Sequence, residues 1–131
     1  MRYLLDTDWL IHALGEREPA YGILDRLTSG GVAISWATVA EVYEGAFDSS
    51  NPQARLIAIR HFVSSYQFIG VDDLIAETFA EIRADLRRRG ELIPDFDILI
   101  AATAVAYDLT LLSFNRTHFD RVRDLRLYRL T

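Results

Sequence analysis

The sequence predicts a three-layer α/β/α sandwich with a central parallel sheet of four to five strands. Short apolar runs typical of strands alternate along the chain with longer runs typical of helices. Strands that alternate with helices favour a parallel sheet covered on both faces. The strand-like runs are apolar throughout, as parallel strands buried on both faces should be. A length of 131 residues fits one domain, so we expect residues 1–131 to fold as a single domain.

The first half of the chain is bounded by clear turn and cap residues. Gly15 ends a short helix, and Ser35 and Thr38 are both candidate N-caps for a later one. Asn51 precedes a proline, which is the pattern of a cap followed by proline at the first helical position. We therefore expect strands at 3–5 and 32–34, and helices at 8–14, at 19–27, from the Ser35 region through Phe47, and from Pro52 to about Ser65.

The second half follows the same alternation. Asp72 or Asp73 is the expected cap of a long helix that ends at Gly90. Asp95 is the expected cap of the next helix. We therefore expect strands at 67–71, 109–112 and near 125–128, and helices from Asp72 or Asp73 to Gly90, at 96–107, and as a short turn around 117–122.

Composition excludes several classes of function. The chain has no cysteine, which excludes disulfides, zinc-thiolate sites and thiol catalysis and is compatible with a reducing cytoplasm. All fourteen basic residues are arginine, so chemistry that needs a lysine amine is excluded. No apolar run approaches the roughly 20 residues that a membrane span needs, and the N-terminus does not resemble a signal peptide. We expect a cytoplasmic protein with no membrane contact.

Polar residues directly follow the expected strands. In parallel sheets the ligand crevice lies outside the carboxyl ends of the strands, so residues at these ends are the ones to examine. They are Asp6-Thr7-Asp8, Ser35 and the residues after it, Asp72-Asp73, and Ser113-Phe114-Asn115.

Three acidic residues are expected to converge at this edge. Asp6 follows the first strand, and Glu41 and Asp97 lie near the beginnings of two helices. Carboxylates brought together repel one another unless they share protons or hold a cation. Oxygen ligands without cysteine or a histidine cluster favour Mg²⁺ or Mn²⁺ over Zn²⁺. Such a site activates a water molecule and stabilises charge on a phosphodiester.

Each of these acids also has a purely structural explanation. Asp6 is a good helix N-cap. Glu41 completes a capping box with Thr38, and Asp97 lies where the helix dipole favours a carboxylate. Asp95 is the better cap for the helix that contains Asp97, which leaves Asp97 available for another role. The three acids point to a site through their joint placement in the alternating pattern.

Four short motifs span nearly the whole chain in order. They are Leu4-Leu5-Asp6-Thr7-Asp8; Ile34-Ser35 with Thr38-Val39-Ala40-Glu41 and Gly45; Asp97-Ile98-Leu99-Ile100-Ala101-Ala102-Thr103-Ala104; and Leu109-Thr110-Leu111-Leu112-Ser113-Phe114-Asn115 with His118-Phe119. With these motifs the chain resembles a PIN domain, specifically a VapC-type toxin nuclease. The third motif is the most specific of the four.

The resemblance implies metal-dependent endonucleolytic cleavage of RNA. It implies that Asp6, Glu41 and Asp97 are the catalytic, metal-binding acids and that the hydroxyls of Thr7 and Ser113 support them. It also implies a PIN-like fold, a homodimer and a cognate antitoxin that neutralises the enzyme.

The fourth motif departs from the family pattern. Many relatives have an acid here, whereas this chain has Asn115 and His118 at the matching positions. Asn115 is still an expected member of the catalytic set, through its carbonyl oxygen or by orienting a water molecule. The loss of one negative charge weakens the case for a second metal ion.

Three further groups of residues have open roles. Asp8 either supports the site or caps the first helix. Arg116, beside Asn115, is an expected RNA phosphate contact, whereas the cluster of Arg83, Arg87, Arg88 and Arg89 suits RNA binding and the dipole of its own helix equally well. Four aromatic residues either line an antitoxin groove or belong to the core, namely Trp9, Trp36, Tyr43 and Phe47.

Two other functions compete with a nuclease. Asp6-Thr7-Asp8 after a strand is similar to the nucleophile motif of haloacid-dehalogenase phosphatases, but the order of the later motifs is wrong for that class. A catalytically inert RNA- or antitoxin-binding module on the same fold would retain binding without cleavage, and Asn115 would mark its degraded site. The retained acidic triad argues against this second alternative.

Overall fold

A five-stranded parallel sheet is the centre of the molecule. The structure is a computed structural model and describes residues 1–130. Over these residues the strands are β1 (Tyr3–Leu5), β2 (Val32–Ser35), β3 (Gln67–Ile69), β4 (Thr110–Leu112) and β5 (Arg126–Leu127). They are arranged in the order β3-β2-β1-β4-β5, and each neighbouring pair is parallel. The predicted three-layer α/β/α fold is therefore confirmed.

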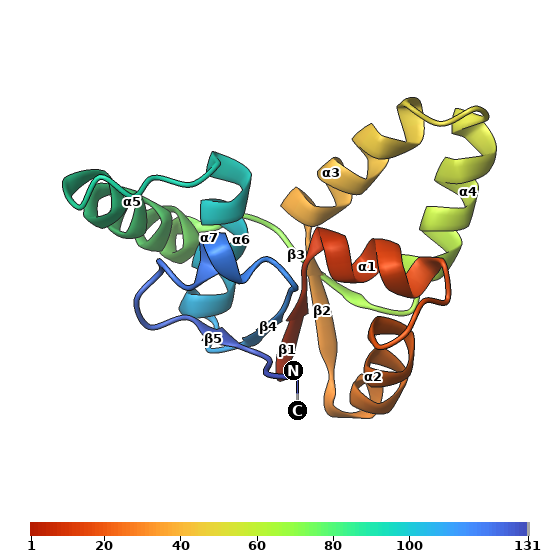
Figure 1. Cartoon of the computed structure of the whole chain (residues 1–131), viewed down its shortest axis with the longest axis horizontal. Helices are drawn as coiled ribbons and strands as arrows, with labels where there is room; N and C mark the ends of the chain where they lie inside the picture. The colour runs from red at the N-terminus through yellow and green to blue at the C-terminus, as the bar shows by residue number, and fades with distance from the viewer. Residues whose placement is uncertain (131) are drawn as a thin grey trace.

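Helices cover both faces of this sheet. Figure 1 shows α1 to α4 on one side and α5 to α7 on the other. The helices of residues 1–130 are α1 (Thr7–Leu14), α2 (Ala20–Leu27), α3 (Trp36–Phe47), α4 (Pro52–Val63), α5 (Asp73–Arg88), α6 (Asp95–Ala106) and α7 (Arg116–Phe119), and a 3₁₀ turn spans Thr28–Gly30. None of these helices is long and apolar enough to cross a membrane.

Successive leucines in β1 explain why the strand is apolar throughout. Side chains alternate between the two faces of a strand. Leu5 packs with the helices α1 to α4, whereas Leu4 packs with α5 and α6, and both side chains are completely buried. Full burial of a leucine contributes roughly 1.5–3 kcal/mol to folding. The sheet thus lies between two hydrophobic cores, one on each face.

One expected helix cap, Asp95, is wrong, and the structure decides between the two candidate caps of α3. Ser35 Oγ accepts a hydrogen bond from the amide of Thr38 at 3.2 Å, so Ser35 caps α3 and Thr38 lies inside the helix. Asp95 is the first residue of α6, after Pro94 at the cap position. Of the two candidates for α5, Asp72 is the cap. The other boundaries lie within three residues of those expected.

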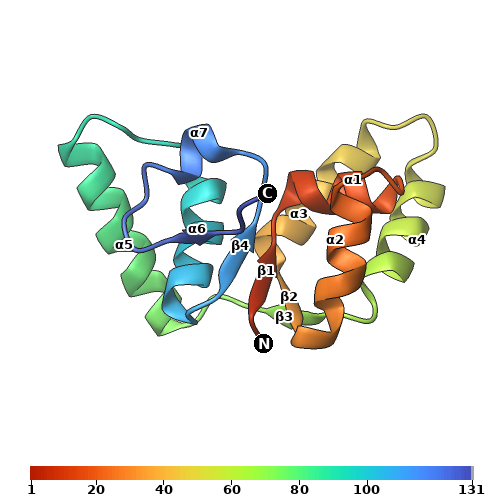
Figure 2. The same ribbon diagram turned by 60° about the horizontal axis from the view of Figure 1, so that its bottom comes forward.

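The fold gathers three helix beginnings at one end of the sheet. Figures 1 and 2 show that β1 and β2 lead directly into α1 and α3, and that α6 begins at the same end. In Figure 1 this end is uppermost. It is the carboxyl end of the parallel strands, where the ligand crevice of such sheets lies.

Candidate functional site

Asp6 is the most buried acid of the chain and follows β1 directly. Only 4% of its surface is exposed, and Ser113 Oγ donates a hydrogen bond to its Oδ2 at 2.7 Å. Asp6 stands at the N-cap position of α1, yet within residues 1–130 its carboxylate makes no capping hydrogen bond. The simple cap explanation of Asp6 is therefore wrong.

The environment of Asp6 disfavours its charged form. Burial, followed by the negative charges of Asp8 and Asp97, raises the pKa of Asp6 from 3.8 to about 7, although the hydrogen bond from Ser113 opposes the rise. A buried acid with a strongly perturbed pKa is a candidate for function. The mutual repulsion would be relieved by a bound cation.

Glu41 faces the same end of the sheet from the second turn of α3. Thr7 Oγ1 donates to Glu41 Oε1 at 2.7 Å, across 34 residues of sequence. Burial, and then the charges of Asp97, Glu44 and Asp8, raise the pKa of Glu41. Because Ser35 caps α3, the capping-box explanation of Glu41 is also wrong.

Asp97 lies in the first turn of α6 and contacts the fourth motif. Its Oδ2 is 2.7 Å from Nδ1 of His118. Asn115 Nδ2 lies 2.9 Å from the same ring nitrogen, and Asn115 Oδ1 accepts the amide of His118 at 3.3 Å as the cap of α7. The side-chain oxygen of Asn115 thus caps α7, while its side-chain nitrogen lies beside the His118 ring. His118 is one of the two residues of the fourth motif that stand where many relatives have an acid.

Asp8 joins α1 to the loop after β4. The amide of Phe114 approaches its two carboxylate oxygens at 3.2 and 3.4 Å. Burial raises the pKa of Asp8, and the Phe114 amide opposes this. Since Asp6 occupies the cap position of α1, Asp8 does not cap that helix, and its contacts are those of a supporting residue.

The predicted acids thus lie near enough for the charge of Asp97 to affect Asp6 and Glu41, whereas one predicted position lies elsewhere. Asp72 caps α5 by accepting the amide of Ile75, and the hydroxyl of Tyr107 also donates to it. Tyr107 follows the last residue of α6, while Asp97 lies in its first turn. Asp72 therefore contacts the end of α6 remote from the acids.

The basic residues have mixed surroundings. Arg83 pairs with Asp95 at 2.9 Å, and Arg89 pairs with Asp85 at 2.7 Å. These contacts favour a structural role for part of the arginine cluster. Arg116 lies 3.2 Å from Asp120 and is partly exposed. It also lines a cavity of about 280 Å³ with Ser113, Phe114, Tyr128, Arg129 and Leu130.

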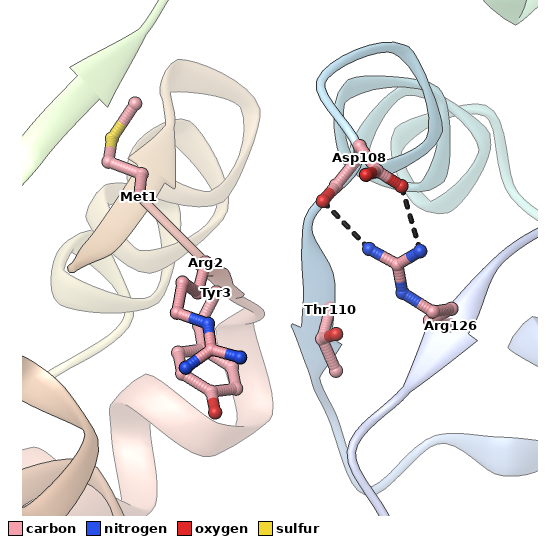
Figure 3. Close-up of a pocket in the computed structure, with 6 residues that line it drawn as sticks. All are labelled: Met1, Arg2, Tyr3, Asp108, Thr110 and Arg126. Carbon is pink, nitrogen blue, oxygen red and sulfur yellow. Dashed lines mark hydrogen bonds and ion pairs between the residues drawn. The ribbon is translucent and has the colours of Figure 1, made fainter. Parts of the chain in front are cut away.

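A second cavity lies at the opposite end of the sheet. It measures about 400 Å³ and is lined by Met1, Arg2, Tyr3, Asp108, Thr110 and Arg126. Figure 3 shows the ion pair between Arg126 and Asp108, with a separation of 2.8 Å. Tyr3 and Thr110 are the first residues of their strands, so this cavity is separated from the acids by the length of the sheet.

The acids suit a hard divalent cation bound partly through water. Within residues 1–130 no three acidic or histidine side chains form a ready-made metal cluster. Mg²⁺ keeps several of its waters and takes only one or two carboxylates directly. A donor set of carboxylate oxygens fits that mode of binding, and Asp6, Glu41 and Asp97 are the residues that would provide it.

Comparison with known proteins identifies the family of the chain. A model of the PIN domain matches residues 3–125, and the chain belongs to the PIN domain family. Ribonuclease VapC2 of Haemophilus influenzae is 37% identical over 128 residues, which cover 96% of both chains. The tRNA(fMet)-specific endonuclease VapC of Shigella flexneri is 31% identical over 126 residues, again 96% of both chains.

The fold comparison gives the same result. One similar chain comes from the solved structure of VapBC2 from Rickettsia felis, which is bound to a DNA fragment from its promoter. That chain and the present one superpose with a TM-score of 0.92 and 27% identity, and the match covers 100% of each. The resemblance to VapC-type PIN nucleases, predicted from the four motifs, is therefore confirmed.

Proposed function

We propose that this chain is an endoribonuclease that depends on Mg²⁺ or Mn²⁺ and acts as the toxin of a toxin–antitoxin pair. The observation that carries the proposal is the placement of Asp6, Glu41 and Asp97 at the carboxyl end of the sheet, where the charge of Asp97 helps to raise the pKa values of both Asp6 and Glu41. The names of the relatives, a ribonuclease and a tRNA endonuclease, support it.

The residues of the site have distinct tasks in this proposal. Asp6, Glu41 and Asp97 would hold the cation, which when bound supplies an activated water and stabilises charge on the phosphodiester. Ser113 and Thr7 each donate to one oxygen of their acid at 2.7 Å, which orients the carboxylates of Asp6 and Glu41. Asp8 fixes the loop that presents Ser113.

RNA would approach the acids along the positively charged wall beside Ser113. Arg116 and Arg129 line the same cavity together with Tyr128. Arginine suits phosphate contacts, and aromatic side chains stack on the bases of single-stranded RNA. This cavity therefore provides both kinds of contact next to the acids, although the chain carries a net charge of −5.

Two protein partners are part of the proposal. The solved structures of relatives are complexes named VapBC, and we propose a cognate antitoxin and a homodimer for this chain. Among the four aromatic candidates, Trp9 is completely buried and stacks on Phe114, so it belongs to the core. Trp36 and Phe47 are exposed on α3 and remain candidates for partner contact.

The two rival functions are less well supported. Membership of the PIN family argues against a haloacid-dehalogenase phosphatase. An inert binding module would have no need to keep three repelling acids together, and here two of them retain their hydroxyl partners.

An RNA-cleavage assay tests the proposal. End-labelled tRNA(fMet) and total RNA would be incubated with the protein and Mg²⁺ or Mn²⁺, with and without EDTA, and a phosphomonoester would be supplied in parallel. We expect RNA cleavage that EDTA abolishes and that Asp6→Ala and Asp97→Ala each reduce by at least about 100-fold. Glu77→Ala is a matched control on an exposed face of α5.

The outcomes separate the alternatives. Phosphate release without RNA cleavage would support the phosphatase. RNA binding without cleavage by the wild-type protein would support the inert module.

A further inference from the structure

His118 occupies a position between two side chains of the fourth and third motifs. Its Nδ1 is 2.7 Å from Asp97 Oδ2 and 2.9 Å from Asn115 Nδ2. The side chain of His118 is 33% exposed and that of Asp97 is 15% exposed. The contact joins α7 to the first turn of α6, so it fixes a carboxylate that belongs to the acidic site.

The chemistry of the His118 ring indicates which of the two neighbours, Asp97 or Asn115, is hydrogen-bonded to Nδ1. A single ring nitrogen carries either a hydrogen or a free lone pair, so Nδ1 makes only one of these bonds at a time. Asn115 Nδ2 is a donor, whereas the carboxylate of Asp97 is a charged acceptor. Hydrogen bonds to charged groups are shorter and stronger than neutral ones. Because the charged acceptor is the stronger partner, we assign the Nδ1 hydrogen to the contact with Asp97 Oδ2.

Asn115 acts on His118 through the backbone. Its Oδ1 accepts the backbone amide of His118 at 3.3 Å, which fixes the beginning of α7. The backbone amide of Asn115 in turn donates to Ser113 Oγ at 3.0 Å, and Ser113 donates to Asp6. A continuous series of hydrogen bonds thus connects Asp97 with Asp6 through the fourth motif.

This series opposes the repulsion between the acids. The charge of Asp97 raises the pKa values of both Asp6 and Glu41, so Asp97 would turn away from them if its side chain were free. A donor on Oδ2 holds the carboxylate in place and leaves Oδ1 available. Hydrogen-bond partners of metal-ligating carboxylates commonly have this orienting role.

We propose that His118 is a positioning residue that holds Asp97 through Nδ1, in the place where many relatives have a fourth acid. Asn115 orients His118 and is not itself a cation ligand. The inference rests on the proposed function, because the orientation of Asp97 matters for the binding of a divalent cation.

Three substitutions of His118 test the proposal. In His118→Asn the amide nitrogen takes the place of ring Nδ1, in His118→Gln it lies nearer the place of Nε2, and in His118→Ala the donor is lost. Mn²⁺ affinity would be measured by electron paramagnetic resonance, and cleavage by single-turnover kinetics. His61→Ala, on an exposed position of α4, is the matched control.

We expect His118→Ala to weaken Mn²⁺ binding and to slow cleavage, each by about 10- to 100-fold, while RNA affinity measured in EDTA stays the same. His118→Asn should recover most of both losses, and His118→Gln should recover less. Wild-type values for His118→Ala would overturn the proposal, as would equal losses for His118→Asn and His118→Ala when both variants melt like the wild type.

A metal-free measurement separates this inference from the proposed function. In EDTA, the ¹⁵N signal of His118 Nδ1 should shift in Asp97→Asn, because a charged acceptor is replaced by a neutral group. An unchanged signal would overturn the pairing of His118 with Asp97 even if the protein cleaves RNA. Wild-type protein that neither binds Mn²⁺ nor cleaves RNA would overturn the proposed function, and the positioning role would fall with it.

Discussion

Ser113 Oγ donates a 2.7 Å hydrogen bond to Asp6 Oδ2 from a position 107 residues further along the chain. The two residues meet because β1 and β4 are neighbours in register, with Leu5 opposite Leu112. Each strand ends one residue before its member of the pair. The register between β1 and β4 therefore brings Ser113 to Asp6, and the bond depends on the pairing of these two strands.

Removal of the Ser113 hydroxyl should change the pKa of Asp6 and the cleavage rate more than it changes the stability of the fold. Ser113→Ala deletes the bond that opposes the raised pKa of Asp6, so we expect that pKa to rise further. We expect cleavage at pH 7 to fall by about tenfold and to recover partly at pH 8.5, where Asp6 is again ionised. The measurement is a pH–rate profile, with the exposed Ser64→Ala on a helix end as control. A profile that keeps the wild-type shape would contradict this role.

Ionisation of Asp6 should lower the free energy of unfolding of the metal-free protein as the pH rises. Acids with a lowered pKa have the opposite effect. Its pKa is about 7 in the folded chain against 3.8 as the usual value, so the folded state binds the proton more tightly than the unfolded state. This contribution is complete below pH 3.8 and is lost as the pH rises through about 7. The largest possible loss is about 4 kcal/mol.

Urea unfolding of the wild type and Asp6→Asn at pH 5 and pH 8, in EDTA, measures this contribution. Asp6→Asn should be the more stable of the two at pH 8, and the difference should shrink or reverse at pH 5. The comparison between variants is needed because acids with lowered pKa values, such as Asp72 and Asp85, change stability in the opposite direction. A pH-independent difference would exclude Asp6 as the source.

A divalent cation should stabilise the folded protein most at high pH, where the site acids are ionised and repel one another most. Ligands that bind only the folded state raise its stability by mass action. We expect Mg²⁺ or Mn²⁺ at 100 times its dissociation constant to add about 2.7 kcal/mol at pH 8. The effect should be smaller at pH 5.5, where protons compete for Asp6. Thermal melts with and without cation give the effect, and Asp6→Asn should lose most of it. An equal rise in Tm for wild type and variant would locate the cation elsewhere.

Particular residues show what the sequence could and could not predict. Asp6, Ser35 and Ser113 were placed correctly because parallel strands end at one edge, and apolar runs mark where strands end. Ser35 and Thr38 were both chemically suitable caps. The choice between them depended on how far β2 extends, and pairing of Ser35 with Ile69 decides it.

The two relationships that could not be predicted from the sequence depend on tertiary packing. Asp72 follows β3, but the hydroxyl that it accepts belongs to Tyr107 at the far end of α6. The contact between His118 and Asp97 depends on how a single-turn helix packs against α6. Neither relationship leaves a periodic pattern in the sequence. The departure of the fourth motif from an acid was the available signal for His118.

Arg116 gives the most direct test of the RNA path. Its pair with Asp120 is exposed on both sides, and exposed pairs contribute little to stability, so the guanidinium is free to exchange Asp120 for a phosphate. In an Asp97→Ala background with EDTA, Arg116→Ala should weaken RNA binding and lower the slope of log K against log salt by about 0.7.

Asp120→Ala should strengthen RNA binding, because it leaves Arg116 without a competing acid. Filter binding from low to high salt measures both, and Arg26→Ala on α2 is the control. If Arg116→Ala and Arg26→Ala give the same slope, the RNA follows another path.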